Sequence, residues 1–190
     1  MVTETPFVRD LITTGAVFGL ACFIWSGWAQ ERPPKRWPVV LGILSGLGVL
    51  AAVGFGIAAW LNWDAPSVLG ADSGGMGPYL VILAIEVGAC VVGAIALSVK
   101  KATRPYVAVL VLFIVGVHFF SLAAVFQMPA MHVVAALTTL ASIAALVLSL
   151  RLRGRADTPA PSFWCGILAA PILLVASVAI GLSGLVQVGR

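Results

Sequence analysis

Two titratable residues, Glu86 and His118, stand within long apolar stretches of this sequence, where ionised groups are rare. An ionised carboxylate in hydrocarbon is costly, so Glu86 must be paired, face protein or water, or stay protonated. A histidine is a natural partner because a carboxylate–imidazole pair offsets desolvation and titrates as one coupled unit. Glu86 and His118 are therefore the candidate catalytic or proton-linked residues. The structural alternative is a protonated Glu86 that hydrogen-bonds across helices without a chemical role.

The positions of these two residues predict that they meet. Glu86 lies seven residues after Tyr79, where one apolar stretch begins, and His118 lies eight residues before Phe126, where the next one ends. At about 1.5 Å per residue, a helical path places both roughly 10–12 Å inside the same boundary. We therefore expect a Glu86–His118 pair between two neighbouring helices.

Other polar and aromatic residues gather in the same half of the apolar stretches and in the adjoining loops. The candidate substrate-binding residues are Ser121, Trp60, Trp63, Asp64, Tyr79 and His132. They predict a pocket open to that side, with the loop 62–78 as its lid. The alternative is that helix ends carry polar and aromatic residues simply because they lie at the lipid headgroups.

The sequence gives little support for metal, redox or cofactor chemistry. Cys22, Cys90 and Cys165 are odd in number, lie within apolar stretches and never form a C-x-x-C pair. His118 and His132 are fourteen residues apart, and with one buried acid they are too few for a metal site. We expect no metal and no cofactor.

The composition defines the solvent in which these residues work. Of the 190 residues, 61% are hydrophobic and only 9% are charged, with a mean hydropathy of +1.11. A soluble domain carries about a quarter of charged residues. A membrane helix needs about 20 apolar residues, and the stretches that qualify are about 11–29, 38–60, 79–99, 105–126, 130–150 and 163–188. They are continuous rather than alternating, which excludes a β-barrel. The sequence predicts an all-α integral membrane protein, a single six-helix transmembrane domain over residues 1–190.

Lysine and arginine predict the orientation of this bundle. They cluster as Arg32, Lys35 and Arg36; Lys100, Lys101 and Arg104; and Arg151, Arg153 and Arg155, in the connections after the first, third and fifth stretches. The positive-inside rule places these three loops in the cytoplasm and both termini outside, in a multi-pass protein of the cell membrane. The net charge of +4 is thus a topology signal with some attraction to anionic lipid, and no nucleic-acid partner is expected.

Small residues spaced four apart predict where the helices approach closely. Such pairs are Gly15/Gly19, Gly42/Gly46, Ala84/Gly88, Ala89/Gly93 and Ser177/Gly181. In addition, residues 82–97 and 167–182 are identical at six of 16 positions. This similarity suggests a 3+3 inverted repeat, an architecture common in transporters. Chance similarity within an alphabet restricted to small and aliphatic residues is the alternative.

Three functions fit these observations. The first is a transporter or channel for a small solute or proton, with Glu86 and His118 as the proton-linked site; at 190 residues it could require a homodimer. The second is a membrane-embedded enzyme that acts on a lipid or isoprenoid, with Glu86 as general acid. The third is an accessory membrane subunit without chemistry. The excess of Arg over Lys, together with abundant Ala, Gly and Val, suggests a bacterial source.

Overall fold

The structure, a computed structural model, describes residues 7–70, 74–155 and 157–189, which are all helical apart from short connections. The α-helices in this described part are α1 (Val8–Trp28), α2 (Trp37–Leu61), α3 (Met76–Ser98), α4 (Val107–Val125), α5 (Pro129–Arg151) and α6 (Pro161–Val188), with two short 3-10 helices, η1 (Ala29–Glu31) and η2 (Arg104–Tyr106). Each α-helix is long and apolar enough to cross a membrane once the short helices are counted with their neighbours. The predicted all-α, six-helix membrane fold is confirmed, although α1 and α3 begin three residues earlier than expected.

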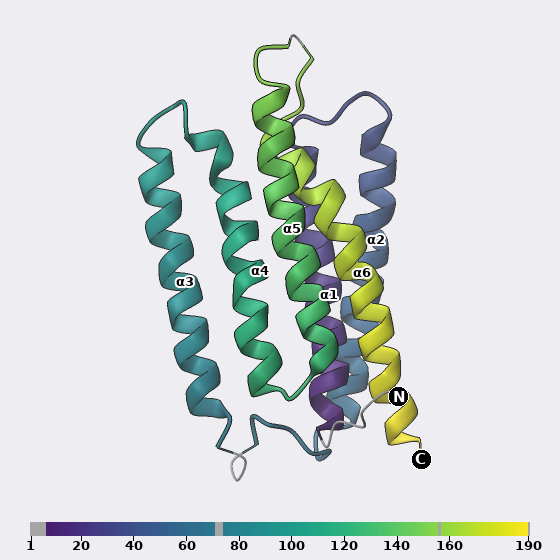
Figure 1. Ribbon diagram of the computed structural model, residues 1–190. Helices are drawn as coiled ribbons and strands as arrows, with labels where there is room; N and C mark the ends of the chain where they lie inside the picture. Colours follow the sequence, from purple (N-terminus) through teal and green to yellow (C-terminus); the bar gives the residue numbers. More distant parts are fainter. Residues whose placement is uncertain (1–6, 71–73, 156, 190) are drawn as a thin grey trace.

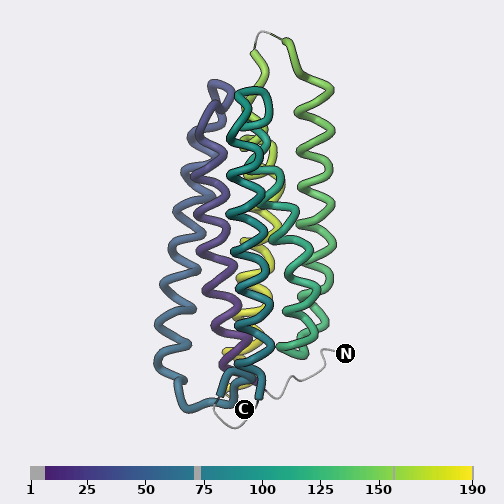
Figure 2. The backbone as a smooth tube through the Cα atoms, turned by 90° about the vertical axis from the view of Figure 1, so that its left-hand side faces the viewer, coloured from purple at the N-terminus to yellow at the C-terminus, as the bar shows by residue number. Residues whose placement is uncertain are grey.

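The helices run up and down, so that the bundle has two distinct ends (Figures 1 and 2). The terminal end contains the start of α1, the end of α6 and the connecting residues 62–70, 74–75 and 126–128. The basic end contains the connecting residues 29–36, 99–106, 152–155 and 157–160 and the three clusters of Lys and Arg. Prolines in the first turns of α2, α5 and α6 fix these starts, because a proline there loses no helical hydrogen bond.

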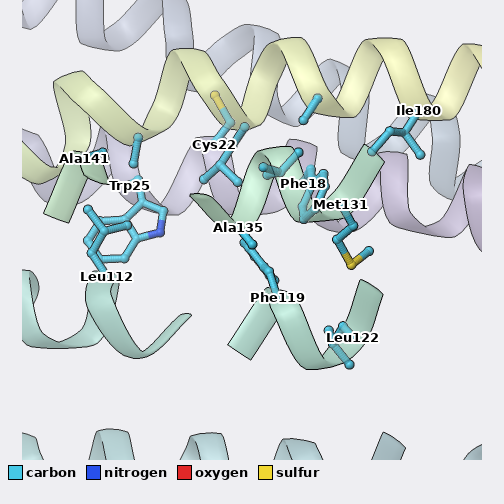
Figure 3. Packing of buried hydrophobic residues seen from close by; sticks show 14 of the residues in the cluster. Phe18, Cys22, Trp25, Leu112, Phe119, Leu122, Met131, Ala135, Ala141 and Ile180 are labelled. Atoms are coloured by element: carbon cyan, nitrogen blue, oxygen red, sulfur yellow. The ribbon is translucent and has the colours of Figure 1, made fainter. Parts of the chain in front are cut away.

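The core lies where α1 and α6 meet α4 and α5. Phe18 of α1 packs edge-on against Phe119 of α4, with ring centroids 5.2 Å apart. Leu112 of α4 and Leu173 of α6 are fully buried in the same cluster. Figure 3 shows the aromatic and aliphatic side chains interleaving between these helices. Since lipid is as apolar as these side chains, such close packing, and not exclusion of water, holds the bundle together.

Glycines allow α1 to touch two helices directly. A Cβ at Gly15 would lie 2.7 Å from the Cα of Gly181 in α6, and the Ser177 hydroxyl donates to the Gly15 carbonyl at 2.6 Å. A Cβ at Gly19 would lie 2.6 Å from the backbone of Ala52 in α2. The close approach predicted for the Gly15/Gly19 and Ser177/Gly181 pairs is therefore confirmed.

Two other pairs, Gly42/Gly46 and Ala84/Gly88, face no neighbouring helix, whereas Gly93 of the Ala89/Gly93 pair faces Leu110 of α4. Among the described residues, nothing lies within 4 Å of a Cβ placed on Gly42, Gly46 or Gly88. The expectation of close packing there is wrong, because α2 and α3 turn these faces away from the bundle. Spacing alone cannot tell a packed face from a lipid-facing one.

The helix α3 lies at the edge of the bundle. Among the described helices it packs extensively against α4 alone, and none of its residues is buried. By contrast, α6 packs against α1, α2, α4 and α5, and it continues as a helix through Pro171. The similar segments 82–97 and 167–182 therefore lie in unlike surroundings, and the inverted repeat stays a prediction.

Candidate functional site

The structure places Glu86 of α3 and His118 of α4 in contact. The Nε2 atom of His118 lies 3.3 Å from Oε2 of Glu86. The two antiparallel helices are joined at the basic end, where Glu86 is twelve residues before the end of α3 and His118 eleven residues after the start of α4. Equal rise along both helices thus brings the side chains to one depth, nearer the terminal end.

Both side chains of the pair are largely buried. The side chain of His118 is 7% exposed and that of Glu86 is 16% exposed. The second ring nitrogen of His118, Nδ1, is buried and has no hydrogen-bond partner among the described residues. Whichever tautomer the ring adopts, one polar group stays unmatched, which costs free energy in an apolar setting. An imidazole with one nitrogen on a carboxylate and the other free can pass a proton or accept a ligand.

A cavity of about 240 Å³ adjoins the pair between α3 and α4. Apart from Glu86, His118 and Ser121, its lining is apolar and comes from both helices. Two lining residues, Ile85 and Val117, are 67% and 45% exposed, so they also form part of the outer surface of the bundle. In a bilayer this cavity faces the lipid chains laterally.

The other predicted site residues divide between the two cavities near the terminal end and the surface. Ser121 lines the cavity of the pair. Tyr79 lines a second, smaller cavity of about 110 Å³ and packs edge-on against Phe126 at 5.9 Å. His132 is exposed, with its ring 6.0 Å from that of Phe120.

The residues predicted from the α2–α3 connection lie away from the pair. Trp60 is exposed in the last turn of α2, and Trp63 and Asp64 are exposed in the loop that follows. Trp63 contacts Arg9 in two ways. The Arg9 guanidinium lies over the indole ring, 4.7 Å from its centroid, and it donates a hydrogen bond to the Trp63 backbone carbonyl. None of the described residues of this loop lines the cavity of Glu86 and His118, whereas Leu69 lines the smaller cavity beside Tyr79. The role of the loop as a lid stays a prediction.

Sequence reasoning missed one buried acid, Asp10. It is only 4% exposed and receives hydrogen bonds at 2.6 Å from the Ser67 hydroxyl and from the Val68 backbone N–H. These bonds fasten the loop to the first turn of α1, above the smaller cavity. Asp10 stands at the start of an apolar stretch, where the sequence does not predict a buried acid. The signal that could have found it is the run of polar residues Thr13 and Thr14 one turn further on.

The remaining His, Cys, Asp and Glu side chains of the described residues form no metal centre. Within residues 7–70, 74–155 and 157–189, no three His, Cys, Asp or Glu side chains gather closely enough to hold a metal ion. The three cysteines are free, two of them buried in the core.

No protein-family model, curated protein or solved structure matches the chain. The composition and the six apolar helices of the described residues define it as a multi-pass membrane protein of a lipid bilayer.

Proposed function

We propose that the protein is a proton-linked carrier of a small lipophilic cation, with Glu86 and His118 as its binding site. The observation that carries this proposal is the 3.3 Å contact between the two side chains beside a cavity otherwise lined almost entirely by apolar residues. A carboxylate in such surroundings needs a positive partner. Both a proton and a lipophilic cation meet that need, and they compete for the same oxygen atoms.

The exchange would proceed by proton transfer at defined atoms. In the proton-loaded form, the Glu86 carboxyl O–H donates to Nε2 of neutral His118. When a cation enters the cavity, Glu86 releases its proton to water and its carboxylate pairs with the cation. Ser121 lies in the same cavity and offers a hydroxyl to a polar substituent of the substrate. Release of the cation and return of the proton close the cycle.

The weak packing of α3 supports a movement during this cycle. No residue of α3 is buried, whereas α1 and α6 carry ten and twelve buried residues. A shift of α3 along α4 would therefore disturb few contacts outside the site itself. Such a shift is the step that would expose the pair to one membrane face and then to the other.

A second candidate function is favoured by the lateral opening of the cavity. A lipid or isoprenoid chain could enter between Ile85 and Val117, and Glu86 would then act as a general acid on it. This enzyme would consume its lipid, whereas a carrier returns its substrate unchanged. Mass spectrometry of the substrate after incubation with the protein distinguishes the two.

Proteoliposomes test the carrier directly. We use tetraphenylphosphonium and ethidium as probe cations and impose a pH gradient without a membrane potential. We expect the cation to enter the liposomes as protons leave them, at a rate several-fold above that of protein-free liposomes. Collapse of the pH gradient should abolish this uptake. Uptake that is unchanged when the gradient is collapsed, or no uptake of either cation, contradicts the proposal.

The proposed function includes an orientation with the basic end in the cytoplasm of a bacterial cell and the terminal end outside. Exposed acids at the two ends give a matched test, since Asp64→Cys and Asp157→Cys make the same change without removing a Lys or Arg. With the three native cysteines replaced by alanine, a membrane-impermeant maleimide applied to intact cells should label position 64 and spare position 157. Labelling of position 157 instead would reverse the orientation.

A further inference from the structure

A cavity at the basic end lies outside the site described above. Its volume is about 550 Å³, and Trp28, Glu31, Ser98, Lys101 and Arg104 form its polar and aromatic wall. It separates the end of α1 and η1 from the end of α3 and η2, with Val107 and Ala108 of α4 as an apolar floor. The ends of membrane helices lie at the level of the lipid headgroups, so this cavity lies at the interface.

One wall of the cavity is cationic and is held in place by its own turn. The Thr103 hydroxyl donates to the Leu97 carbonyl at 2.7 Å, and the Arg104 N–H donates to the Lys100 carbonyl at 3.1 Å. These bonds fix the turn from which Lys101 and Arg104 extend. Neither cation forms a salt bridge with any acid of the described chain, so both are available to an anion.

The opposite wall is acidic and aromatic. Glu31 accepts a hydrogen bond of 2.6 Å from the Ser162 hydroxyl of α6, and in the part of the chain that the structure describes it pairs with no cation. Trp28 is stacked on buried Trp25, with centroids 5.3 Å apart and planes 17° from parallel. The cavity thus presents fixed positive charge on one side and fixed negative charge, beside an indole ring, on the other.

We propose that this cavity binds the headgroup of a phospholipid that carries a primary amine, such as phosphatidylethanolamine. The phosphodiester pairs with Lys101 and Arg104, whose multiple N–H donors suit its oxygens. The ammonium pairs with Glu31 and lies beside the Trp28 ring, which attracts cations. The apolar floor and the interfacial depth favour an anchored lipid over a soluble phosphate.

Lipid binding to the purified, delipidated protein tests this assignment. Titration with phosphatidylethanolamine and with phosphatidylglycerol is followed by native mass spectrometry and by the shift in unfolding temperature that a bound lipid produces. We expect tighter binding of phosphatidylethanolamine to the wild type. The double variant K101Q/R104Q should bind both lipids about tenfold more weakly. The matched control R151Q/R153Q removes the same charge from the exposed end of α5 and the loop that follows it, also at the basic end, and should bind as the wild type does.

Two further arms separate the parts of the proposal. Glu31→Gln should abolish the preference for the amine-bearing lipid and leave phosphatidylglycerol binding intact. Equal binding of the two lipids by the wild type, or equal losses in K101Q/R104Q and in the control, would overturn the assignment. Displacement of the lipid by millimolar phosphoethanolamine would point to a soluble ligand and would also overturn it.

Discussion

Replacement of Glu86 by glutamine is expected to abolish proton-driven uptake of tetraphenylphosphonium while leaving the folded protein intact. Glutamine has nearly the shape of glutamate, and its amide N–H can donate to Nε2 of His118 in place of the protonated carboxyl, which lies 3.3 Å from that nitrogen in the native pair. It cannot hold or release a proton, however, and it cannot neutralise a cation. We expect uptake to fall at least about 100-fold and the free energy of unfolding to change by less than about 1 kcal/mol.

The matched control for this variant is Asp64→Asn. It makes the same acid-to-amide change at an exposed loop position that was predicted for the site but lies outside its cavity. Uptake by Asp64→Asn should equal that of the wild type. A Glu86→Gln protein that still transports would exclude the pair as the proton site. If the variant unfolded instead, Glu86 would be a structural residue of the α3–α4 contact.

The second large effect concerns stability. Gly15→Ala is expected to destabilise the protein by about 1–3 kcal/mol, because its new methyl group would lie 2.7 Å from the Cα of Gly181. That contact joins α1 and α6, the two central helices, and neither backbone can move without disturbing the core around Phe18. The Ser177 hydrogen bond to the Gly15 carbonyl would lengthen at the same time.

Gly42→Ala provides the comparison for this substitution. The described residues leave open space around a Cβ at position 42, and alanine is the better helix former by about 0.5–1 kcal/mol. This variant should therefore unfold at the same temperature as the wild type or slightly above it. Thermal unfolding in one detergent, followed by circular dichroism, checks both. If Gly15→Ala and Gly42→Ala lost the same stability, the face of α2 that contains Gly42 would pack against another protein chain.

The helices could be predicted from the sequence because a bilayer demands long, continuous apolar stretches. The contact between Glu86 and His118 followed from counting residues, since neighbouring helices rise at the same rate. The helix positions and the common depth of Glu86 and His118 depend only on distance along the membrane normal. The proposed roles of the two residues stay a prediction.

The features that could not be predicted depend on how the helices turn about their axes. Gly15 and Gly42 stand in the same small-residue pattern, yet one meets a backbone and the other faces outward. The loop after α2 was expected to form a lid over a polar pocket, but its attachment to Asp10 through Ser67 could not be predicted from the sequence. The face that each helix turns to its neighbours depends on how all the helices pack together. The periodicity of a single segment does not reveal that packing.

The central claim, exchange of a proton for a cation at Glu86, is tested most directly by proton release. Tetraphenylphosphonium is added to the purified protein in weakly buffered detergent, and the pH change is recorded alongside binding measured by calorimetry. We expect the wild type to release up to about one proton for each cation bound, and Glu86→Gln to release none. Binding by the wild type without release, or the same release from Glu86→Gln, would contradict the account.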